Sequence, residues 1–329
     1  MTEPRRWRLA ASAFNWTPEV IRAERTAADI AVGIVADGLA SVIEVEAGQV
    51  WRTFPTPTDA EADRLRGLLE PVGGAVSIVG VSIDDWATPR RRRDDDERLA
   101  FLLPQLRAAH RLGAAGVRLP IGQAGEPLLR RLQPTLHELD LVLYEELQGQ
   151  QTPRSQSAAP ALDTIARLDD PHVRALVDTS MFMPALPVTY LERLREEGVP
   201  GEFVDRLAAQ WRDPATADAV LDMLRQEAVP PQAHTLFMDL VVRFGRSEVA
   251  ELRDMLPLVG AFHLKFWDLA DIDGRVSGPI GELGRLLEGS DFTGTLCSEW
   301  GGHAWLDADP TDMTRRHLAL VRSALGSAY

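Results

Sequence analysis

The sequence lacks cysteine almost entirely: Cys297 is the single cysteine among 329 residues. No disulfide can form within the chain, so we expect a reducing, cytoplasmic setting. A long apolar segment is also missing, because no run approaches the roughly 20 residues that a membrane span requires. Residues 1–8 contain basic side chains with no apolar run behind them, and we therefore expect no export signal and no contact with a membrane.

Basic residues are scarce relative to acidic ones. The chain has 35 Lys and Arg against 49 Asp and Glu, a formal net charge of -14. This balance argues against nucleic acid as a main partner, because phosphate binding needs a basic face. Hydrophobic residues make up 45% of the chain, which is typical of a globular protein. We find no internal repeat, and the length suits one barrel domain over residues 1–329.

Strand-like and helix-like segments alternate along most of the chain. The expected strands cover residues 7–14, 41–46, 74–83, 116–121, 140–147, 174–178, 260–266 and 294–300. Helical spacing of apolar residues marks residues 18–37, 59–69, 95–112, 126–139, 159–168 and a last helix with Asp309 as N-cap and Pro310 at its first position. Eight strands with intervening helices predict an α/β fold, a (β/α)₈ TIM barrel.

The alternation stops over residues 181–256. This stretch has helical segments at residues 188–197, 201–211, 215–226, 234–244 and 247–256, and no clear strand. We interpret it as a helical insertion between the sixth and seventh strands.

A charged run precedes one of the expected helices. Residues 90–97 read Arg-Arg-Arg-Arg-Asp-Asp-Asp-Glu, and their acidic part falls in the first turn of the helix over residues 95–112. Negative charge is favourable there because of the helix dipole. We interpret the run as a solvated helix start, with phosphate binding by the arginines as the alternative.

Charged side chains recur where the expected strands end. Because the carboxyl ends of barrel strands meet at one face, these side chains predict one shared polar site. The strand over residues 140–147 contributes Glu145 or Glu146, since alternation lets one of the two face inward. The full set is Glu145 or Glu146, Asp178, His263 and Glu299.

Three carboxylates and one imidazole form a set of hard ligands that suits Mn²⁺ or Mg²⁺. Carboxylates that face one another would repel without a cation, which also favours a metal site. Each residue has a structural explanation when taken singly: Asp178 could cap a turn, His263 could be a core histidine, and Glu299 could be an edge residue. Their joint occurrence at successive strand ends favours the metal site.

Three segments in the second half of the chain are Ala261-Phe-His-Leu-Lys-Phe-Trp-Asp268, Ser277-Gly-Pro-Ile-Gly-Glu282 and Phe292-Thr-Gly-Thr-Leu-Cys-Ser-Glu299. They resemble the xylose isomerase-like TIM-barrel family, which includes sugar isomerases, sugar epimerases and inosose dehydratases. Residues 141–146 and 176–179 extend the resemblance. It implies that the metal ligands are Glu146, Asp178, His263 and Glu299, and that Lys265 contacts either the substrate or one of these ligands.

The chain departs from the family at one position. Relatives often have a histidine two residues after the ligand that matches Glu146, and this chain has Gln148, which argues against a catalytic use of that position. Glu145, Glu146 and His303 are the candidate proton acceptors; an exposed loop histidine is the alternative for His303. An aromatic wall for the substrate is expected from Trp267, Trp300, Trp305 and Phe182, although core packing competes for these side chains.

A narrower resemblance is carried by Leu176-Val-Asp-Thr-Ser-Met-Phe-Met-Pro184, by the helical insertion and by Ser298-Glu-Trp-Gly-Gly-His303. These features resemble the α subunit of bacterial C-glycoside deglycosidases. The resemblance implies a Mn²⁺-dependent lyase that works with a small β-rich partner subunit. Such a lyase cleaves the carbon–carbon bond between a 3-oxo sugar and an aromatic aglycone. A stand-alone metal-dependent sugar isomerase or epimerase is the alternative, and a non-catalytic barrel that scaffolds a partner is the third hypothesis.

Overall fold

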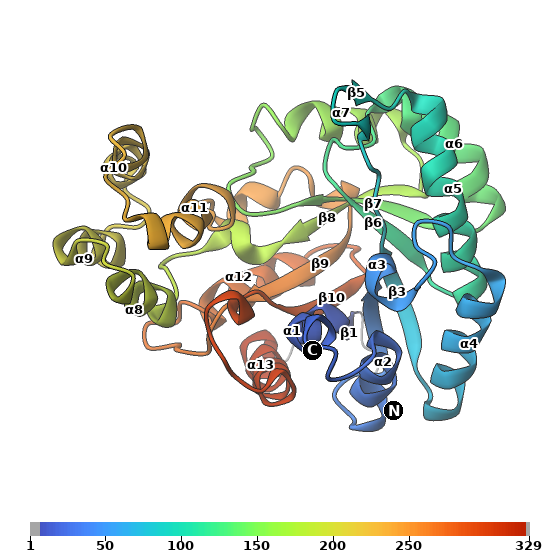
Figure 1. The fold of residues 1–329 in the computed structure, drawn as a ribbon, viewed down its shortest axis with the longest axis horizontal. Coiled ribbons are helices and arrows are strands. Elements are labelled where there is room, and N and C mark those ends of the chain that lie inside the picture. The colour runs from blue at the N-terminus through green and yellow to red at the C-terminus, as the bar shows by residue number, and fades with distance from the viewer. Residues whose placement is uncertain (1–6, 327–329) are drawn as a thin grey trace.

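The computed structural model describes residues 7–326 and contains a closed barrel of parallel strands surrounded by helices (Figure 1). The basic segment of residues 1–6 lies outside the described residues. The barrel strands are β1 (Arg8–Ser12), β2 (Val42–Glu46), β3 (Ala75–Gly80), β6 (Gly116–Pro120), β7 (Val142–Leu147), β8 (Val173–Asp178), β9 (Val259–Phe266) and β10 (Thr295–Trp300). They pair in chain order, and β1 closes the barrel against β10. The predicted (β/α)₈ fold is confirmed.

Helices cover the outside of the barrel: α2 (Ala27–Ala36), α4 (Asp59–Leu69), α5 (Asp95–Leu112), α6 (Glu126–Glu138), α7 (Ala159–Leu168), α12 (Ser277–Glu288) and α13 (Pro310–Leu325). The short helices α1 (Thr17–Ile21) and α3 (Ala47–Val50) instead follow β1 and β2 at the carboxyl end of the barrel. Their ends follow local chemistry. Asp94 and Glu97 form a reciprocal capping box at the start of α5, and Gly113 ends that helix in the left-handed conformation. No described helix is long and apolar enough to cross a bilayer.

Three sequence predictions of helices need correction. The helix expected over residues 18–37 is two helices, because Ala23 has a φ of 56° and Thr26 caps a new start. The helix expected over residues 247–256 is wrong: 3₁₀ turns η5 (Val249–Leu252) and η6 (Leu256–Leu258) occupy that stretch. Helix α12 was not predicted, although its buried Ile280, Leu283 and Leu287 have helical spacing.

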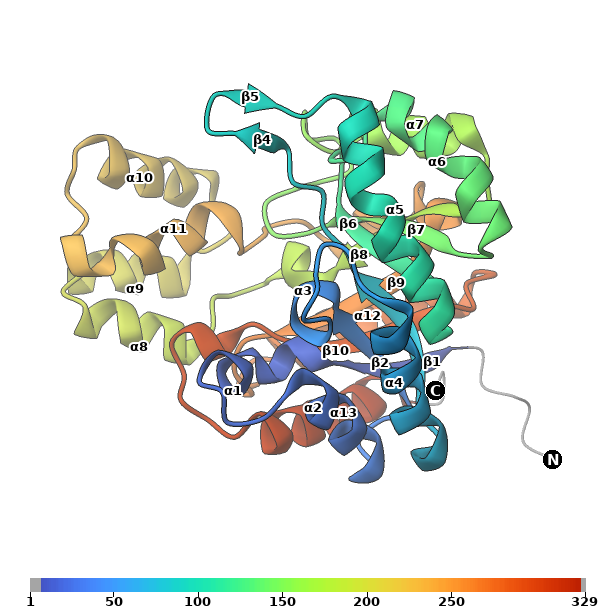
Figure 2. The same cartoon turned by 45° about the vertical axis from the view of Figure 1, so that its right-hand side comes forward.

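The arginine run forms part of a small hairpin that the sequence did not reveal. Strands β4 (Trp86–Thr88) and β5 (Arg91–Arg92) pair antiparallel and project beyond the barrel (Figure 2). Arg91 pairs with Glu97 of α5 at 2.7 Å. The acidic end of the run starts α5 as predicted, while the preceding arginines belong to the hairpin and its neighbouring turn.

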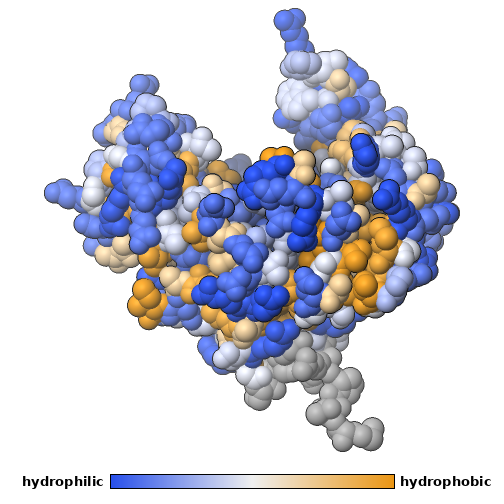
Figure 3. Space-filling view, turned by 60° about the horizontal axis from the view of Figure 1, so that its bottom comes forward, coloured by the Kyte–Doolittle hydropathy of each residue, from blue (hydrophilic) through white to orange (hydrophobic). Residues whose placement is uncertain are grey.

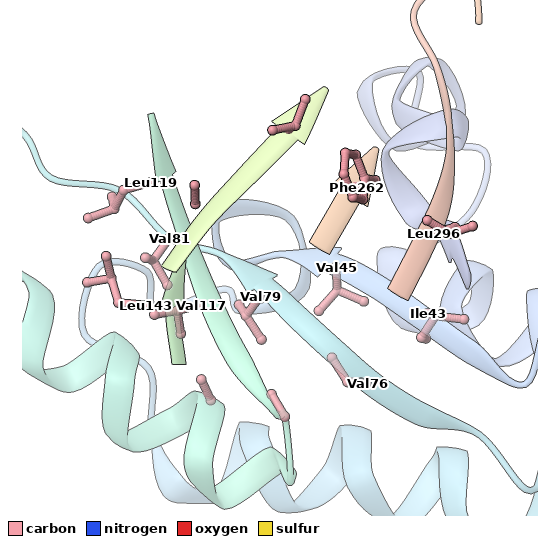
Figure 4. Packing of buried hydrophobic residues seen from close by; sticks show 14 of the residues in the cluster. Ile43, Val45, Val76, Val79, Val81, Val117, Leu119, Leu143, Phe262 and Leu296 are labelled. Atoms are coloured by element: carbon pink, nitrogen blue, oxygen red, sulfur yellow. The ribbon is translucent and has the colours of Figure 1, made fainter. Parts of the chain in front are cut away.

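Alternation along the barrel strands sorts their side chains into two sets. The side chains that face the helices are apolar, among them Ile43, Val45, Val79, Val117, Leu143 and Leu296 (Figure 4). The side chains that face the barrel interior are apolar toward the amino end, where Leu176 and Ala261 pack with Ile78. Toward the carboxyl end the interior side chains are charged, and this change of character positions the site.

The helical insertion lies between β8 and β9, the sixth and seventh barrel strands, as predicted. It consists of α8 (Val188–Glu196), α9 (Gly201–Ala209), α10 (Pro214–Arg225) and α11 (His234–Val242), which project to one side of the barrel (Figures 1 and 2). Its core includes Trp211, Phe237 and Phe244. Asp268 fastens it to the barrel by accepting hydrogen bonds of 2.9 Å from the backbone N and Oγ1 of Thr189. The molecular surface is hollowed between two raised lobes (Figure 3).

Candidate metal and substrate site

Four polar side chains meet inside the carboxyl end of the barrel. Side chains two residues apart on a strand face the same side of the sheet. On each of four neighbouring strands, a side chain in the barrel interior is therefore followed, two residues later, by a polar side chain that also faces the interior. The pairs are Tyr144 and Glu146, Leu176 and Asp178, Ala261 and His263, and Cys297 and Glu299. One ligand atom from each polar residue lies within 4.8 Å of those of the others. The structure thus brings together the predicted set, here called the carboxylate–histidine cluster: Glu146, Asp178, His263 and Glu299.

His263 has one ring nitrogen occupied and one available. Its Nε2 lies 2.8 Å from Glu44 Oε2, which fixes the ring orientation. Its Nδ1 lies 2.8 Å from Glu146 Oε1 and 3.2 Å from Glu299 Oε2, yet makes no hydrogen bond of good geometry with the described residues. Burial lowers the pKa of His263, but the surrounding carboxylates outweigh burial and raise it well above its usual value.

Asp178 divides its two oxygens between two roles. Its Oδ1 accepts a hydrogen bond of 2.7 Å from the Ser180 backbone N, so it does cap the turn that follows β8. Its Oδ2 is buried and has no hydrogen-bond partner among the described residues. Burial raises the pKa of this carboxyl to about 6. An acceptor left unpaired in the interior costs free energy, so Oδ2 is an atom that a bound cation would satisfy.

The cluster contains its own counter-charges, which corrects the prediction from repulsion alone. Lys265 Nζ lies 2.8 Å from Glu299 Oε2 and 3.6 Å from Asp178 Oδ2. Arg118 Nη1 lies 2.7 Å from Glu146 Oε2, and its Nη2 pairs with Glu46. Repulsion among the carboxylates is therefore partly neutralised by the chain itself. The fit to a divalent cation is carried instead by the unpaired Asp178 Oδ2 and His263 Nδ1 within one set of hard donors.

The cluster opens into a cavity of about 800 Å³, here called the carboxyl-end cavity. Polar groups suited to sugar hydroxyls line it, including Gln49, Ser82, Gln148, Gln150, Gln151 and Ser180. Aromatic rings form another part of its wall, contributed by Phe14, Phe54 and Trp267. Of the aromatic residues proposed from the sequence, Trp267 lines this cavity.

Glu145, Trp300 and His303, which the sequence also proposed for the site, lie outside both the cluster and the lining of the carboxyl-end cavity. Glu145 is on the opposite face of β7, fully buried, where its Oε2 accepts a hydrogen bond of 3.2 Å from Gly122 N. Trp300 packs with Phe266 in the core, and its indole N–H donates to the Trp267 carbonyl at 2.8 Å.

His303 lies in the short turn η7 (Gly302–Ala304) and lines a separate hollow of about 380 Å³ beside Trp300. Its ring centroid is 5.0 Å from that of Phe14, which also lines the carboxyl-end cavity. Burial, followed by the charge of Lys265, lowers the pKa of His303 to about 4. His303 is therefore near the cavity but does not line it.

Sequence reasoning missed Glu44, Glu46 and Arg118. The two glutamates alternate with the helix-facing Ile43 and Val45 on β2, and this period of two was a usable signal for two acidic side chains in the barrel interior. Arg118 is the single charged residue in the short strand β6, so no alternation of polar and apolar residues indicated which way its side chain points.

No family model matches the chain. A C-glycoside deglycosidase alpha subunit from Arthrobacter globiformis is 27% identical over 328 residues, covering 97% of this chain and 93% of that protein. A 3'-dehydrocarminate deglycosidase alpha subunit from Microbacterium sp. is 24% identical, covering 97% of this chain and 95% of that protein. This chain is similar to C-glycoside deglycosidase alpha subunits over nearly its whole length. The resemblance predicted from the sequence is confirmed.

Solved structures support the same fold. A D-allulose 3-epimerase from Methylomonas sp. aligns with a TM-score of 0.56 at 12% identity, over 97% of this chain and 98% of that one. A 3-keto-D-glucoside 4-epimerase from E. coli aligns with a TM-score of 0.52 at 14% identity, over 96% of this chain and 99% of that one. At these identities the likeness concerns the fold alone, a closed (β/α)₈ barrel.

Proposed function

We propose that this protein is the catalytic subunit of a cytoplasmic, metal-dependent lyase that cleaves 3-oxo-C-glycosides. Its substrate would be a sugar joined through a carbon–carbon bond to an aromatic aglycone. The carboxylate–histidine cluster at the floor of the carboxyl-end cavity carries the proposal. The similarity to deglycosidase alpha subunits over 97% of the chain supports the choice of reaction.

Glu146, Asp178, His263 and Glu299 would hold the cation, which we propose to be Mn²⁺, with Mg²⁺ as a second candidate. A bound dication supplies Lewis acidity that makes a hydrogen beside a sugar carbonyl easier to remove. Glu44 keeps the Nδ1 of His263 directed at the cluster by occupying Nε2. Lys265 and Arg118 hold two of the ligand carboxylates, Glu299 and Glu146, in place.

The chain itself provides the binding surface. Amide and hydroxyl side chains in the carboxyl-end cavity can donate to and accept from sugar hydroxyls, while Phe14, Phe54 and Trp267 offer apolar faces to a planar aglycone. Lys265 Nζ lies 5.6 Å from the centroid of the Trp267 ring, so its charge borders this aromatic wall. We propose Lys265 as a substrate contact. For Trp300 we propose a supporting role behind the wall, because its side chain is buried against Phe266.

We further propose that the protein acts with a second, small β-rich subunit. The support is that its relatives are named alpha subunits. Co-purification of the chain with a small protein encoded beside it would test this pairing. Activity that is complete without any such protein would count against it.

The function is tested by incubating the purified protein, with and without Mn²⁺ and the candidate partner, with a 3-oxo-C-glucoside and separately with free ketohexoses. Release of the aglycone that requires Mn²⁺ supports the lyase. Conversion of ketohexoses without aglycone release would instead support a sugar isomerase or epimerase, whose fold this barrel shares. Absence of both activities, together with absence of bound metal, would leave a scaffolding barrel.

A further inference from the structure

The proposed reaction needs a group that removes a proton from the carbon beside the sugar carbonyl. The titratable side chains lining the carboxyl-end cavity, among the described residues, are Glu46, Arg118, Glu146, Arg243, Lys265 and Glu299. The two arginines stay protonated, and the Lys265 ammonium is held by two carboxylates. Glu146 has Arg118 on one oxygen and His263 beside the other. Glu299 is a proposed ligand, so Glu46 is the remaining candidate.

Glu46 lines the carboxyl-end cavity. It is the last residue of β2, and its side chain is 24% exposed. The Arg118 guanidinium forms ion pairs with Glu46 Oε1 and with Glu146 Oε2. It therefore connects the Glu46 carboxylate to the carboxylate–histidine cluster. The other oxygen, Oε2, has no hydrogen bond to any described residue and is therefore free to accept a proton.

A glycine on the neighbouring strand makes room for this carboxylate. Gly80 ends β3 and lies between Glu46 and Arg118 in the register of the barrel. A Cβ atom at position 80 would overlap Glu46 Oε2, so any residue larger than glycine would displace this carboxylate. Burial raises the pKa of Glu46 in spite of the opposing charge of Arg118, which strengthens it as a proton acceptor.

Resting on the proposed lyase function, we propose that Glu46 is the catalytic base that starts the elimination. Its Oε2 takes the hydrogen from the carbon between the 3-oxo group and the carbon that bears the aglycone. The electron pair of that C–H bond forms an enolate with the carbonyl. When the carbonyl re-forms, a carbon–carbon double bond forms in the ring and the bond to the aglycone breaks. The aglycone carbon keeps that electron pair and takes back the proton from Glu46, so no oxidant or reductant is needed.

The test compares Glu46→Gln with wild type on a 3-oxo-C-glucoside in the presence of Mn²⁺ and the candidate partner. Glutamine keeps an acceptor for Arg118 but cannot take a proton. We expect kcat to fall by about 10²- to 10⁴-fold, with KM and the Mn²⁺ dissociation constant changed by less than about threefold. In D₂O, NMR should show slow or no exchange of the substrate hydrogen beside the carbonyl. If Glu46→Gln does not fold, Glu46→Asp keeps the charge, shortens the reach and should still lose at least about tenfold in kcat.

Glu44→Gln is the matched variant on the same strand. Because Glu44 holds His263, this variant should weaken Mn²⁺ binding by about 10- to 100-fold, whereas Glu46→Gln should not. Wild-type turnover is measured first, since its absence would overturn the lyase function itself. With an active wild type, the inference about Glu46 is overturned if Glu46→Gln retains turnover and hydrogen exchange. It is equally overturned if His303→Gln abolishes the exchange while Glu46→Gln does not.

Discussion

A large hollow lies at each end of the barrel. The two hollows are similar in size, but their charged side chains are exposed at one end and buried at the other. The groove at the amino end is about 970 Å³ and lies between α12 and the turns η5 and η6. The carboxyl-end cavity is about 800 Å³. The charged residues of the groove, among them Arg253 and Arg285, are exposed to solvent. The charges at the floor of the cavity are buried, with Asp178 and His263 fully so.

This difference shows which hollow is built for chemistry. Exposed charges cost little, whereas each buried charge carries a desolvation penalty of roughly several kcal/mol. Five carboxylates, those of Glu44, Glu46, Glu146, Asp178 and Glu299, share the barrel interior with the cations Arg118 and Lys265. Packing alone does not require so costly an arrangement. Buried charge, rather than volume, therefore identifies the site.

The largest effect is expected for Glu299→Gln. Loss of one ligand charge should abolish cation binding and lower turnover by at least about 1,000-fold, because the Lewis acid is lost. The thermal midpoint should stay close to that of wild type, since the amide fills the same space. Turnover, calorimetric Mn²⁺ titration and thermal unfolding measure the three quantities. Full activity in this variant would remove the proposed site.

The second-largest loss of turnover is expected for Gly80→Ala, because the added methyl group displaces the Glu46 carboxylate. A displacement of about 1 Å can cost on the order of 10²-fold in rate, so we expect a fall of 10- to 100-fold at unchanged Mn²⁺ affinity. Gly67→Ala on the exposed side of α4 is the matched control, because nothing lies within 4 Å of its new Cβ. Equal kinetics in the two variants would contradict the role given to Gly80.

Asn15→Ala tests how the end of β10 is held. The Asn15 side chain is fully buried, accepts a hydrogen bond of 2.7 Å from Trp300 N and donates one of 3.3 Å to the Ser298 carbonyl, on either side of Glu299. Leaving these backbone groups unpaired should lower the free energy of unfolding by about 1–3 kcal/mol. Urea denaturation measures the loss, and an unchanged midpoint would show that solvent or a rearranged loop replaces the amide.

A pH-dependent effect on stability is expected from His317. Burial lowers its pKa to about 3, and its ring stacks on Phe266 at 3.9 Å. In the unfolded chain His317 takes up a proton as the pH falls below about 6.5, whereas in the folded chain it stays neutral. Protonation therefore favours the unfolded state, and the free energy of unfolding falls as the pH is lowered from about 6.5 toward 3. Urea midpoints measured from pH 7 to pH 4 should fall more steeply for wild type than for His317→Gln. Parallel curves would show that His317 does not contribute.

The smallest effect is expected at the amino-end groove. Arg253→Ala and Arg285→Ala alter exposed side chains, and turnover, Mn²⁺ affinity and unfolding midpoint should match wild type within error. A loss of activity in either variant would make the groove functional and would break the contrast between the two ends.

Much of the fold follows from sequence periodicity. Apolar strands and amphipathic helices alternate strongly enough to predict the barrel and the insertion before β9. The errors lie where the periodicity of apolar residues gives no information. Ala23 adopts a left-handed conformation that divides the first expected helix in two. The charged run that was interpreted as a solvated helix start contributes strand β5, which pairs with β4. A period of two on one strand does not reveal which other strand lies beside it.

The carboxylate–histidine cluster could be predicted because each member ends a strand, and strand ends converge in a barrel. Its partners could not. Glu46 and Arg118 lie 72 residues apart and meet because Gly80 leaves space between their strands. Strand alternation left the choice between Glu145 and Glu146 open, and the family resemblance favoured Glu146, which β7 places in the barrel interior beside Arg118.

The central claim is that the four side chains of the cluster hold one divalent cation. Diffraction from crystals soaked in Mn²⁺, recorded at the manganese absorption edge, tests it directly. If the cluster binds the ion, one strong anomalous peak will lie about 2.0–2.3 Å from an oxygen each of Glu146, Asp178 and Glu299 and from His263 Nδ1. A fully active enzyme whose crystals show no peak among these atoms, or show it elsewhere, would contradict it.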